Sequence, residues 1–456
     1  MVESNAMKTT AQTGRLKAAP ENFLRPDQIL QVQSGRRDFL RGALLAAGAS
    51  ALPAVAFSEE ARSAGEKVIL EPLPHAITLG QPVAATGYGM PSKYERNLAR
   101  RESPGLNRVA AASVAFSPLQ AMFGIITASG LHFERHHQGW YDIDPSQHRL
   151  MVMGSDASLL KSPKVFTMDD LMRLPSVSRM HFIECGANTG MEWGNVAVPT
   201  VQYTHGMLSC SEFTGVRLRD VLEFCGANFR KGRFVLAEGG DGSGLTRTIP
   251  MEMIESGEVL LAYGMNGEML RPENGYPLRL VVPGVQGVSW VKWLRRVELG
   301  DAPYGTKDET LHYVDLMPDA RLRQYASLQE VKSVLTTPSG GQVLHGKGFY
   351  GLSGLAWSGR GAIRRVDVSV DGGRQWRVAR LQPPVMAKCL TRFSLGWTWG
   401  GQTALAMSRA TDDSGHVQPT YAALRAVRGR RSIYHNNAIQ TWLVGESGEV
   451  SNVQLA

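Results

Sequence analysis

Residues 180–190, Met-His-Phe-Ile-Glu-Cys-Gly-Ala-Asn-Thr-Gly, decide how this chain is interpreted. Alternating apolar and polar residues predict a strand up to the cysteine, and the two glycines after it predict a turn. Cys185 therefore stands at the mouth of a loop, where its thiolate can bind a soft metal. The other cysteines, Cys210, Cys225 and Cys389, form no C-x-x-C pair, haem motif or zinc spacing. The chain thus carries no haem, and Cys185 acts alone or holds a metal that brings most of its own ligands.

The tetrapeptide Cys-Gly-Ala-Asn occurs a second time, at residues 225–228. There it follows a helical pattern over residues 216–224, and glycine after a helix is ordinary terminator chemistry. The sequence therefore favours Cys185 over Cys225 as the functional thiol. Among Cys210, Cys225 and Cys389 we expect at most one disulfide.

Local signals predict two further elements of the first domain. Thr167 is placed to cap a short helix that ends before Pro175. The apolar residues 260–263 lead to Asn266-Gly267, a pair typical of a tight hairpin turn.

Length and charge limit the class of protein. A chain of 456 residues exceeds one typical core, so we expect two domains and a terminal extension. The formal charge is +8, of which residues 1–56 contribute +3, leaving +5 for the remainder. The body of the chain has no basic run, which argues against nucleic-acid binding and leaves an anionic substrate or an acidic partner protein.

The first 56 residues are similar to a twin-arginine export signal. Arg36-Arg37 precedes a short apolar stretch, and Ala54-Val55-Ala56 offers a small-residue cleavage site. The apolar stretch is shorter than the ~20 residues that span a bilayer, so we expect no membrane span. Twin-arginine export carries folded proteins, which predicts a periplasmic enzyme loaded with its cofactor before export. The alternative is an ordinary basic, apolar helix.

Residues 57–120 are rich in Pro, Gly and Ala and are expected to wrap irregularly around the fold. The chain then becomes dense in aromatic residues and histidines around Arg135, His136 and His137. Adjacent residues of an extended chain point to opposite sides, so the two histidines do not easily share one metal. The cluster suits a phosphate or an anionic heterocycle better than zinc.

Two cations, Arg279 and Lys292, stand in otherwise apolar sequence. A buried charge without a partner is expensive, so each needs an anion or the rim of a site. A phosphate would satisfy both. The alternative is that Glu268, Glu273 and Glu298 neutralise them.

The last part of the chain, residues 331–456, alternates strongly between apolar and polar residues. Val366, Val368 and Val370 share one face before the turn at residues 371–373. Several such segments separated by short turns predict a β-sandwich of immunoglobulin-like type.

The order of these motifs resembles that of the sulfite oxidase family of molybdenum enzymes. The resemblance covers nearly everything after residue 120 and rests on the following segments: 135–137, 185–188, 260–263, 266–267, 275–279 and 282–294. Within the family, the likeness is strongest to molybdenum subunits of sulfane dehydrogenases of the Sox system. The resemblance implies an α+β fold: a molybdopterin-binding domain over residues 121–330, then an immunoglobulin-like dimerisation domain over residues 331–456.

The resemblance also implies roles for individual residues. Cys185 becomes the protein ligand of a molybdenum held by one pyranopterin. The residues implied to hold that cofactor are Arg135, His136, His137, Asn274, Arg279, Gly287, Ser289 and Lys292. The catalytic residues implied are Arg135, Tyr304, with Tyr313 as the alternative active-site tyrosine, and Arg360.

One departure bears on the substrate. Sulfite oxidases carry an arginine that helps to bind sulfite where this chain has Gly190. The resemblance therefore implies oxygen transfer to sulfane sulfur on the cysteine of a carrier protein, as in thiosulfate oxidation, with electrons passed to a c-type cytochrome subunit. The alternatives are a sulfite dehydrogenase and a non-catalytic periplasmic binding protein. A homodimer is implied through the C-terminal domain.

Overall fold

The computed structural model describes residues 91–95, 97–103, 110–194, 196, 198–324, 328–429 and 431–455. The predicted export signal at residues 1–56 lies outside these residues, as does much of the predicted wrap at 57–120. No helix in the described part is long and apolar enough to cross a membrane.

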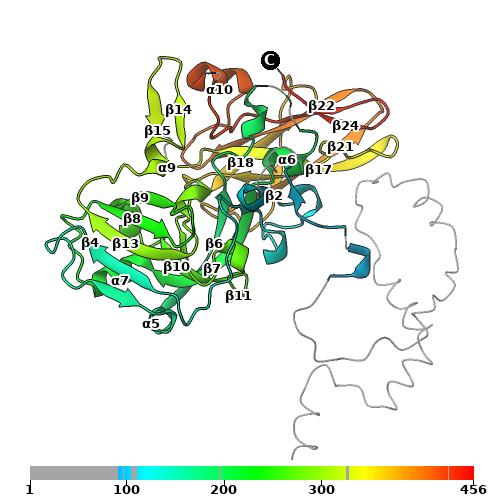
Figure 1. The fold of residues 1–456 in the computed structure, drawn as a ribbon. Helices are drawn as coiled ribbons and strands as arrows, with labels where there is room; N and C mark the ends of the chain where they lie inside the picture. Colours follow the sequence, from blue (N-terminus) through cyan, green and yellow to red (C-terminus); the bar gives the residue numbers. More distant parts are fainter. Residues whose placement is uncertain are drawn as a thin grey trace, which may run out of the picture. The chain divides into compact units, whose positions relative to one another are not determined.

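The first domain is built on two five-stranded sheets (Figure 1). The first sheet contains β11 (Glu268–Met269), β10 (Leu260–Met265), β7 (Leu208–Arg217) and β6 (Ser176–Glu184) in that order, with β12 (Arg279–Val281) also on β10. The second contains β5 (Lys164–Phe166), β4 (Leu150–Gly154), β13 (Leu294–Gly300), β8 (Phe234–Gly239) and β9 (Thr246–Pro250). The pairing is antiparallel throughout, except that β13 runs parallel to β4.

Short elements connect and cover these sheets. The helices are α5 (Met168–Met172), α6 (Val201–His205), α7 (Leu218–Phe224), α8 (Met251–Glu255) and α9 (Lys307–Thr310). The remaining strands are β1 (Arg101–Glu102), β2 (Val114–Phe116) and β3 (Glu134–Arg135), which form a small sheet, and the hairpin of β14 (Val314–Leu316) and β15 (Leu322–Gln324). The 3-10 segments are η2 (Lys93–Glu95), η3 (Ala110–Ala112), η4 (Leu119–Ala121), η5 (Ser129–Leu131), η6 (Gly190–Trp193), η7 (Pro272–Asn274) and η8 (Gly287–Ser289).

The local signals of the first domain are confirmed. Thr167 caps α5 and forms a capping box with Asp170. Asn266 (φ 53°) and Gly267 (φ 78°) form the turn between β10 and β11 with two left-handed residues, as a tight hairpin requires. These elements follow from neighbours in sequence, so sequence patterns suffice to place them.

The second domain is a sandwich of two antiparallel sheets, as predicted. One sheet contains β16 (Lys332–Thr337), β17 (Gly348–Trp357), β21 (Thr391–Trp399) and β20 (Arg380–Leu381); the other contains β19 (Arg377–Val378), β18 (Ile363–Ser369), β22 (Ala404–Asp412), β23 (Thr441–Val444) and β24 (Val450–Val453). Val366 and Val368 are buried between the sheets. Helix α10 (Tyr421–Arg428) lies on the connection from β22 to β23.

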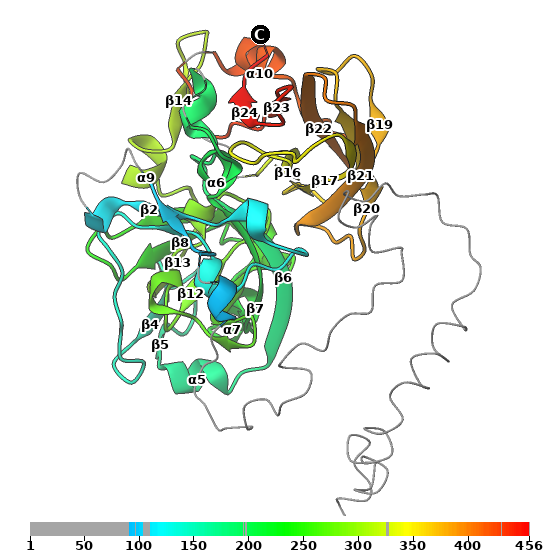
Figure 2. The same cartoon turned by 90° about the vertical axis from the view of Figure 1, so that its right-hand side faces the viewer.

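The sheet that contains β6 and β7 contributes to the cores of both domains. Phe182 and Cys210 pack into the core of the sandwich, whereas Ile183 and Phe213 belong to the core of the first domain. In Figures 1 and 2, β6 and β7 lie between the β4–β13–β8 sheet and the sandwich. Because successive side chains of a strand point to opposite faces, β6 is held from both sides up to the residue before Cys185.

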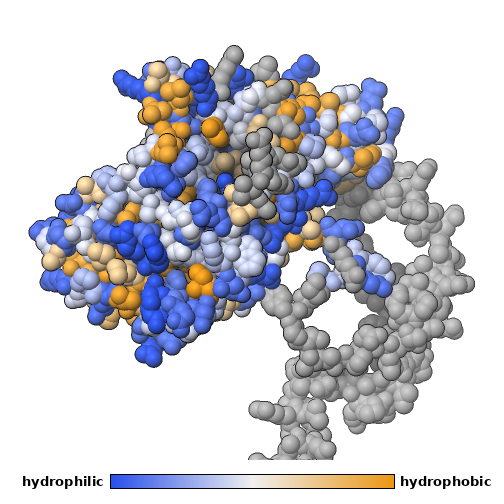
Figure 3. Space-filling view, in the orientation of Figure 1, coloured by the Kyte–Doolittle hydropathy of each residue, from blue (hydrophilic) through white to orange (hydrophobic). Residues whose placement is uncertain are grey.

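The surface is mixed, with small apolar groups among polar residues (Figure 3). One apolar group lies over the β14–β15 hairpin, where Leu322 is 71% exposed. Tyr313 immediately precedes this hairpin and is buried. The hairpin therefore begins at a buried aromatic side chain and carries apolar residues into solvent.

Candidate active site

Cys185 lies where two cavities meet. The amide of Cys185 donates to the carbonyl of Met207 (3.0 Å), and its carbonyl accepts from the amide of Asn188 (2.9 Å), so the turn after β6 is fixed. An inner cavity of about 80 Å³ and an outer cavity of about 710 Å³ share this wall. The residues that line both are Arg135, His137, Cys185, Leu245 and Tyr313. The thiol thus faces a small inner compartment and a larger outer one at once.

Burial favours the protonated thiol of Cys185, which makes it a poor free nucleophile. Burial raises the pKa of the Cys185 thiol, and the charge of Arg135 opposes that shift. A bound metal would replace the proton and favour the thiolate. Among the described residues, no group of three or more His, Cys, Asp or Glu side chains could hold a metal ion. A metal on Cys185 would fit a cofactor that brings most of the other ligands.

The inner cavity contains two buried cations. The Arg279 guanidinium donates to the carbonyls of Asn274 (2.9 Å) and Trp290 (3.1 Å), and burial lowers its pKa to about 9. The Lys292 ammonium donates to the carbonyl of Glu273 (3.2 Å), and burial lowers its pKa to about 7. Neither cation has a carboxylate within ion-pair distance in the described part of the chain. Both therefore favour an anionic ligand.

The proposed neutralisation by three glutamates is wrong. Glu268 binds Arg271 (3.2 Å) and Glu298 binds Arg296 (2.6 Å). The third, Glu273, has its carboxylate 3.5 Å from Arg100 and reaches Lys292 only through its backbone carbonyl. Arg271 and Arg296 lie within three residues of their glutamates, whereas the pairing of Glu273 with Arg100 is distant in sequence and depends on the fold.

Unpaired polar atoms around the cavity fit a heterocycle with donors and acceptors. His132 Nε2, Asn274 Oδ1 and Arg279 Nε are buried without a hydrogen-bond partner. Burial lowers the pKa of His132 to about 3 and that of His137 to about 4, so both rings are neutral near pH 7. Neutral rings, amide groups and cations together match a pyranopterin with its phosphate. Buried groups of this kind rarely remain unpaired in a functional protein.

Most of the predicted cofactor residues come together around this cavity. Those that line the inner cavity are Arg135, His136, His137, Cys185, Asn274, Arg279, Gly287 and Lys292. Ser289 is buried nearby but does not line it. The sequence analysis missed His132, Asp241 and Trp293, which also line it. His132 and Trp293 stood beside predicted residues, and adjacency was the only available signal.

The structure places Tyr313 at the site and Tyr304 away from it. Tyr304 lines neither cavity and donates its hydroxyl to the Glu298 carboxylate (3.3 Å). Tyr313 lines both cavities and stacks on Tyr434, with ring centroids 4.8 Å apart. Burial raises the pKa of Tyr313, so its hydroxyl keeps its proton. Of the two tyrosines left open by the sequence, Tyr313 is the one in reach of Cys185.

Arg360 also lies outside both cavities. It is exposed at the end of the Trp-Ser-Gly turn, where its amide donates to Ser358 Oγ (3.2 Å). The turn itself approaches the first domain closely, because Gly359 abuts Gly284. The arginine thus lies near the site without lining it.

Gly190 lines the outer cavity, close to the second domain. A Cβ atom at this position would lie 2.7 Å from the carbonyl oxygen of Ile433. Any side chain here requires the Ile433 backbone to move. The glycine therefore permits the close approach of residue 433 at the wall of the outer cavity.

The remaining cysteines lie in the cores. All four cysteines are free thiols, and Cys225 is fully buried at the end of α7. Cys210 and Cys389 bring their sulfur atoms to 3.3 Å. This pair is the one that could form the single predicted disulfide.

A lone cysteine beside a cavity of buried cations and neutral rings defines a molybdopterin-dependent oxidoreductase. Two family descriptions match the chain: "Oxidoreductase molybdopterin binding domain" over residues 137–307 and "Mo-co oxidoreductase dimerisation domain" over residues 324–442. The chain belongs to the sulfite oxidase family. The resemblance seen in the sequence and the two-domain α+β fold are thereby confirmed.

Known relatives include animal sulfite oxidases. Human mitochondrial sulfite oxidase is 33% identical over 332 residues, which cover 67% of this chain and 59% of the human protein. Sulfite oxidase of Gallus gallus is 33% identical over 321 residues, which cover 65% and 69% of the two chains. The chain thus spans about three fifths of the length of the human relative.

A solved structure is more similar in sequence. It is the sulfane dehydrogenase SoxCD from Paracoccus pantotrophus, with 45% identity and a TM-score of 0.81. The match covers 84% of this chain and 97% of the solved chain. The chain thus resembles this sulfane dehydrogenase in both sequence and fold.

Proposed function

We propose that this molybdenum oxidoreductase oxidises sulfane sulfur that a carrier protein holds on a cysteine, and passes the electrons to a c-type cytochrome in the periplasm. The likeness to SoxCD supports the substrate class. The outer cavity is the structural observation that carries the proposal. Its volume of about 710 Å³ far exceeds that of a sulfite ion and leaves room for a substrate attached to a protein arm.

The residues of the site have different roles in this proposal. Cys185 and the inner-cavity cations would hold the molybdopterin, and this cofactor supplies oxygen-atom transfer to sulfur. Arg135 faces both cavities, so its charge stabilises the oxyanion that develops on the sulfur. Tyr313, protonated, can donate a hydrogen bond to the same oxyanion. His137 stays neutral and adds no further charge.

Two properties of the whole assembly complete the proposal. The sequence has no haem motif, so electrons must leave to another protein, and a net positive charge suits an acidic partner. The matched dimerisation domain supports a homodimer. Export through the twin-arginine route would deliver the loaded enzyme to the periplasm.

A sulfite dehydrogenase is the second candidate, because the curated relatives named above are sulfite oxidases. The deciding experiment supplies the metal-loaded protein with free sulfite and, separately, with a carrier protein bearing a cysteine persulfide. Reduction of a c-type cytochrome is followed in both cases. We expect faster reduction with the carrier-bound sulfur. Faster reduction with free sulfite would overturn the substrate, and a wild-type protein without molybdenum would overturn the function as a whole.

A further inference from the structure

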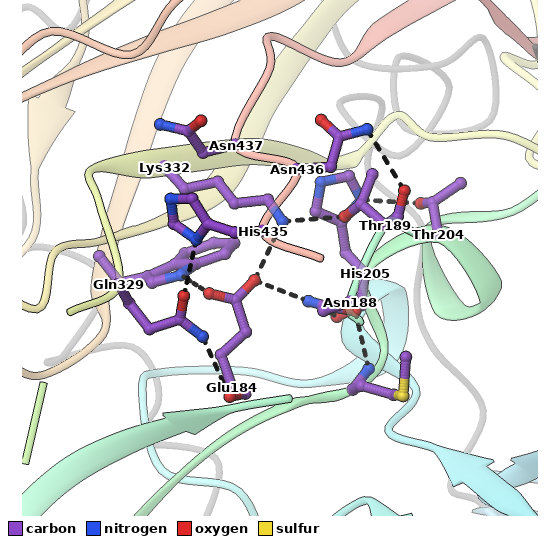
Figure 4. Close-up of polar contacts among 12 residues, drawn as sticks. Glu184, Asn188, Thr189, Thr204, His205, Gln329, Lys332, His435, Asn436 and Asn437 are labelled. Carbon is purple, nitrogen blue, oxygen red and sulfur yellow. Dashed lines mark hydrogen bonds and ion pairs between the residues drawn. The ribbon is translucent and has the colours of Figure 1, made fainter. Parts of the chain in front are cut away.

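A buried polar network includes residues just before and after Cys185 in the chain and joins the two domains (Figure 4). Its centre is the Glu184 carboxylate, the residue before the proposed metal ligand. This carboxylate accepts from Lys332 Nζ (2.9 Å), Asn188 Nδ2 (2.9 Å) and Trp357 Nε1 (2.8 Å). Lys332 and Trp357 come from β16 and β17 of the sandwich. The network therefore fixes the end of β6 from the other domain.

The Lys332 ammonium holds both ends of the Cys185 loop. Besides Glu184, it donates to Thr189 Oγ1 (2.8 Å), so one charged group bridges the residue before Cys185 and the residue four positions after it. Figure 4 shows Nζ between these two partners. Lys332 is 2% exposed, and Thr189 adopts a left-handed conformation (φ 65°). The contact thus stabilises a turn that the threonine backbone alone disfavours.

Three further contacts reach the same loop from the C-terminal region. The amide of His435 donates to the carbonyl of Gly186 (2.7 Å), and Asn436 Nδ2 donates to the carbonyl of Thr189 (3.3 Å). Gln329 Nε2 donates to the carbonyl of Glu184 (3.1 Å). The loop is thereby held at residues 184, 186 and 189 by residues after position 328.

We infer that Lys332 and Glu184 are positioning residues, which set the orientation of Cys185 toward its metal by tying both ends of its loop to the sandwich. A domain matched as a dimerisation domain thus also completes the active site of its own chain. The inference rests on the proposed function only in taking the ligand of Cys185 to be molybdenum. A purely structural ion pair between domains would stabilise the fold without affecting the metal.

The experiment compares three single variants with the wild type in a host that makes the cofactor. Lys332→Met removes the ammonium. Thr189→Val removes the hydroxyl that this ammonium contacts, and Lys332 keeps Glu184 as its partner, so no buried charge is left unpaired. Lys388→Met is the matched control, because Lys388 pairs with Glu258 across the same two domains but away from the loop. Thermal unfolding, molybdenum per chain, the electron paramagnetic resonance spectrum of the pentavalent metal, kcat and KM are measured for each.

We expect Lys332→Met to retain at least about tenfold less molybdenum than the wild type. Loss of a residue that supports a metal ligand weakens metal binding by a similar factor in other sites. Thr189→Val should fold and load, with shifted resonance g values and a several-fold lower kcat at unchanged KM. Lys388→Met should lose stability alone. If Lys332→Met does not fold, Thr189→Val decides.

Wild-type spectra in Thr189→Val and wild-type molybdenum in folded Lys332→Met would overturn the inference and leave the proposed function standing. Absence of molybdenum from the wild type would instead overturn the proposed function, and the inference with it.

Discussion

The same four residues, Cys-Gly-Ala-Asn, do different things at positions 185–188 and 225–228. The first copy follows β6, and its cysteine lines two cavities. The second ends α7, where Gly226 (φ 71°) terminates the helix and Cys225 is fully buried. One copy is a buried strand end that lines cavities and is held by another domain, and the other is a helix cap inside a core. The function of a short motif therefore depends on the element that precedes it.

The strongest test of this contrast substitutes the two cysteines in parallel. We expect Cys185→Ser to fold and to lose more turnover than the roughly 100-fold that a supporting residue costs a metal site, because it removes the thiolate ligand itself. Cys225→Ser should keep its molybdenum and lose only stability, on the order of 1–3 kcal/mol for burying a hydroxyl without a partner. Elemental mass spectrometry and turnover assays check both. Full activity in Cys185→Ser would contradict the assignment.

Sequence alone predicted the strand and turn around the first copy, because the signals that indicate them are local. The alternation before Cys185, the cap at Thr167 and the hairpin at Asn266-Gly267 each depend on a few neighbouring residues, and the structure confirms these elements. The cluster of cations at Arg279 and Lys292 was also visible as charge in apolar sequence.

The sequence could not choose between Tyr304 and Tyr313, nor place Arg360. Their positions depend on how loops meet across domains, and on contacts between residues more than 100 positions apart. The pairing of Glu184 with Lys332 is of this kind, since the two lie 148 positions apart in the chain. No spacing rule links them.

Low pH should destabilise β6, the strand before the first copy, more than α7, the helix before the second. Burial lowers the pKa of His181 in β6 to about 4, from 6.5. The unfolded chain therefore binds more protons than the folded one between these values, so stability is full above pH 6.5 and falls as the pH drops toward 4. At pH 5 the loss is on the order of 2 kcal/mol.

Denaturant unfolding of the wild type and of His181→Gln at pH 7 and pH 5 measures this loss. In His181→Gln, the free energy of unfolding should differ less between pH 7 and pH 5 than in the wild type, by on the order of 2 kcal/mol. An equal difference in both proteins would show that His181 does not cause the acid sensitivity.

The smallest expected effect concerns the glycines of the two copies. Gly226→Ala places a side chain at a left-handed residue and should cost about 1–2 kcal/mol of stability. Gly186→Ala meets only the flexible end of Gln286, whose Oε1 lies 2.4 Å from the added Cβ. It should leave the fold intact and disturb the metal spectrum. Thermal unfolding and paramagnetic resonance separate the two, and a reversed pattern would refute the distinction.

The buried cations of the inner cavity also make the stability of the fold depend on whether the cofactor is bound. An empty protein keeps Arg279 and Lys292 close together with no carboxylate of the described residues at ion-pair distance, so their mutual repulsion weakens it. A bound anion relieves this cost and adds its binding free energy to the folded state. Molecules with and without the bound cofactor in one preparation should therefore unfold at different temperatures. The amplitude of the higher transition would measure the fraction that holds the cofactor. A cell that exports only folded chains would favour filled molecules on stability alone.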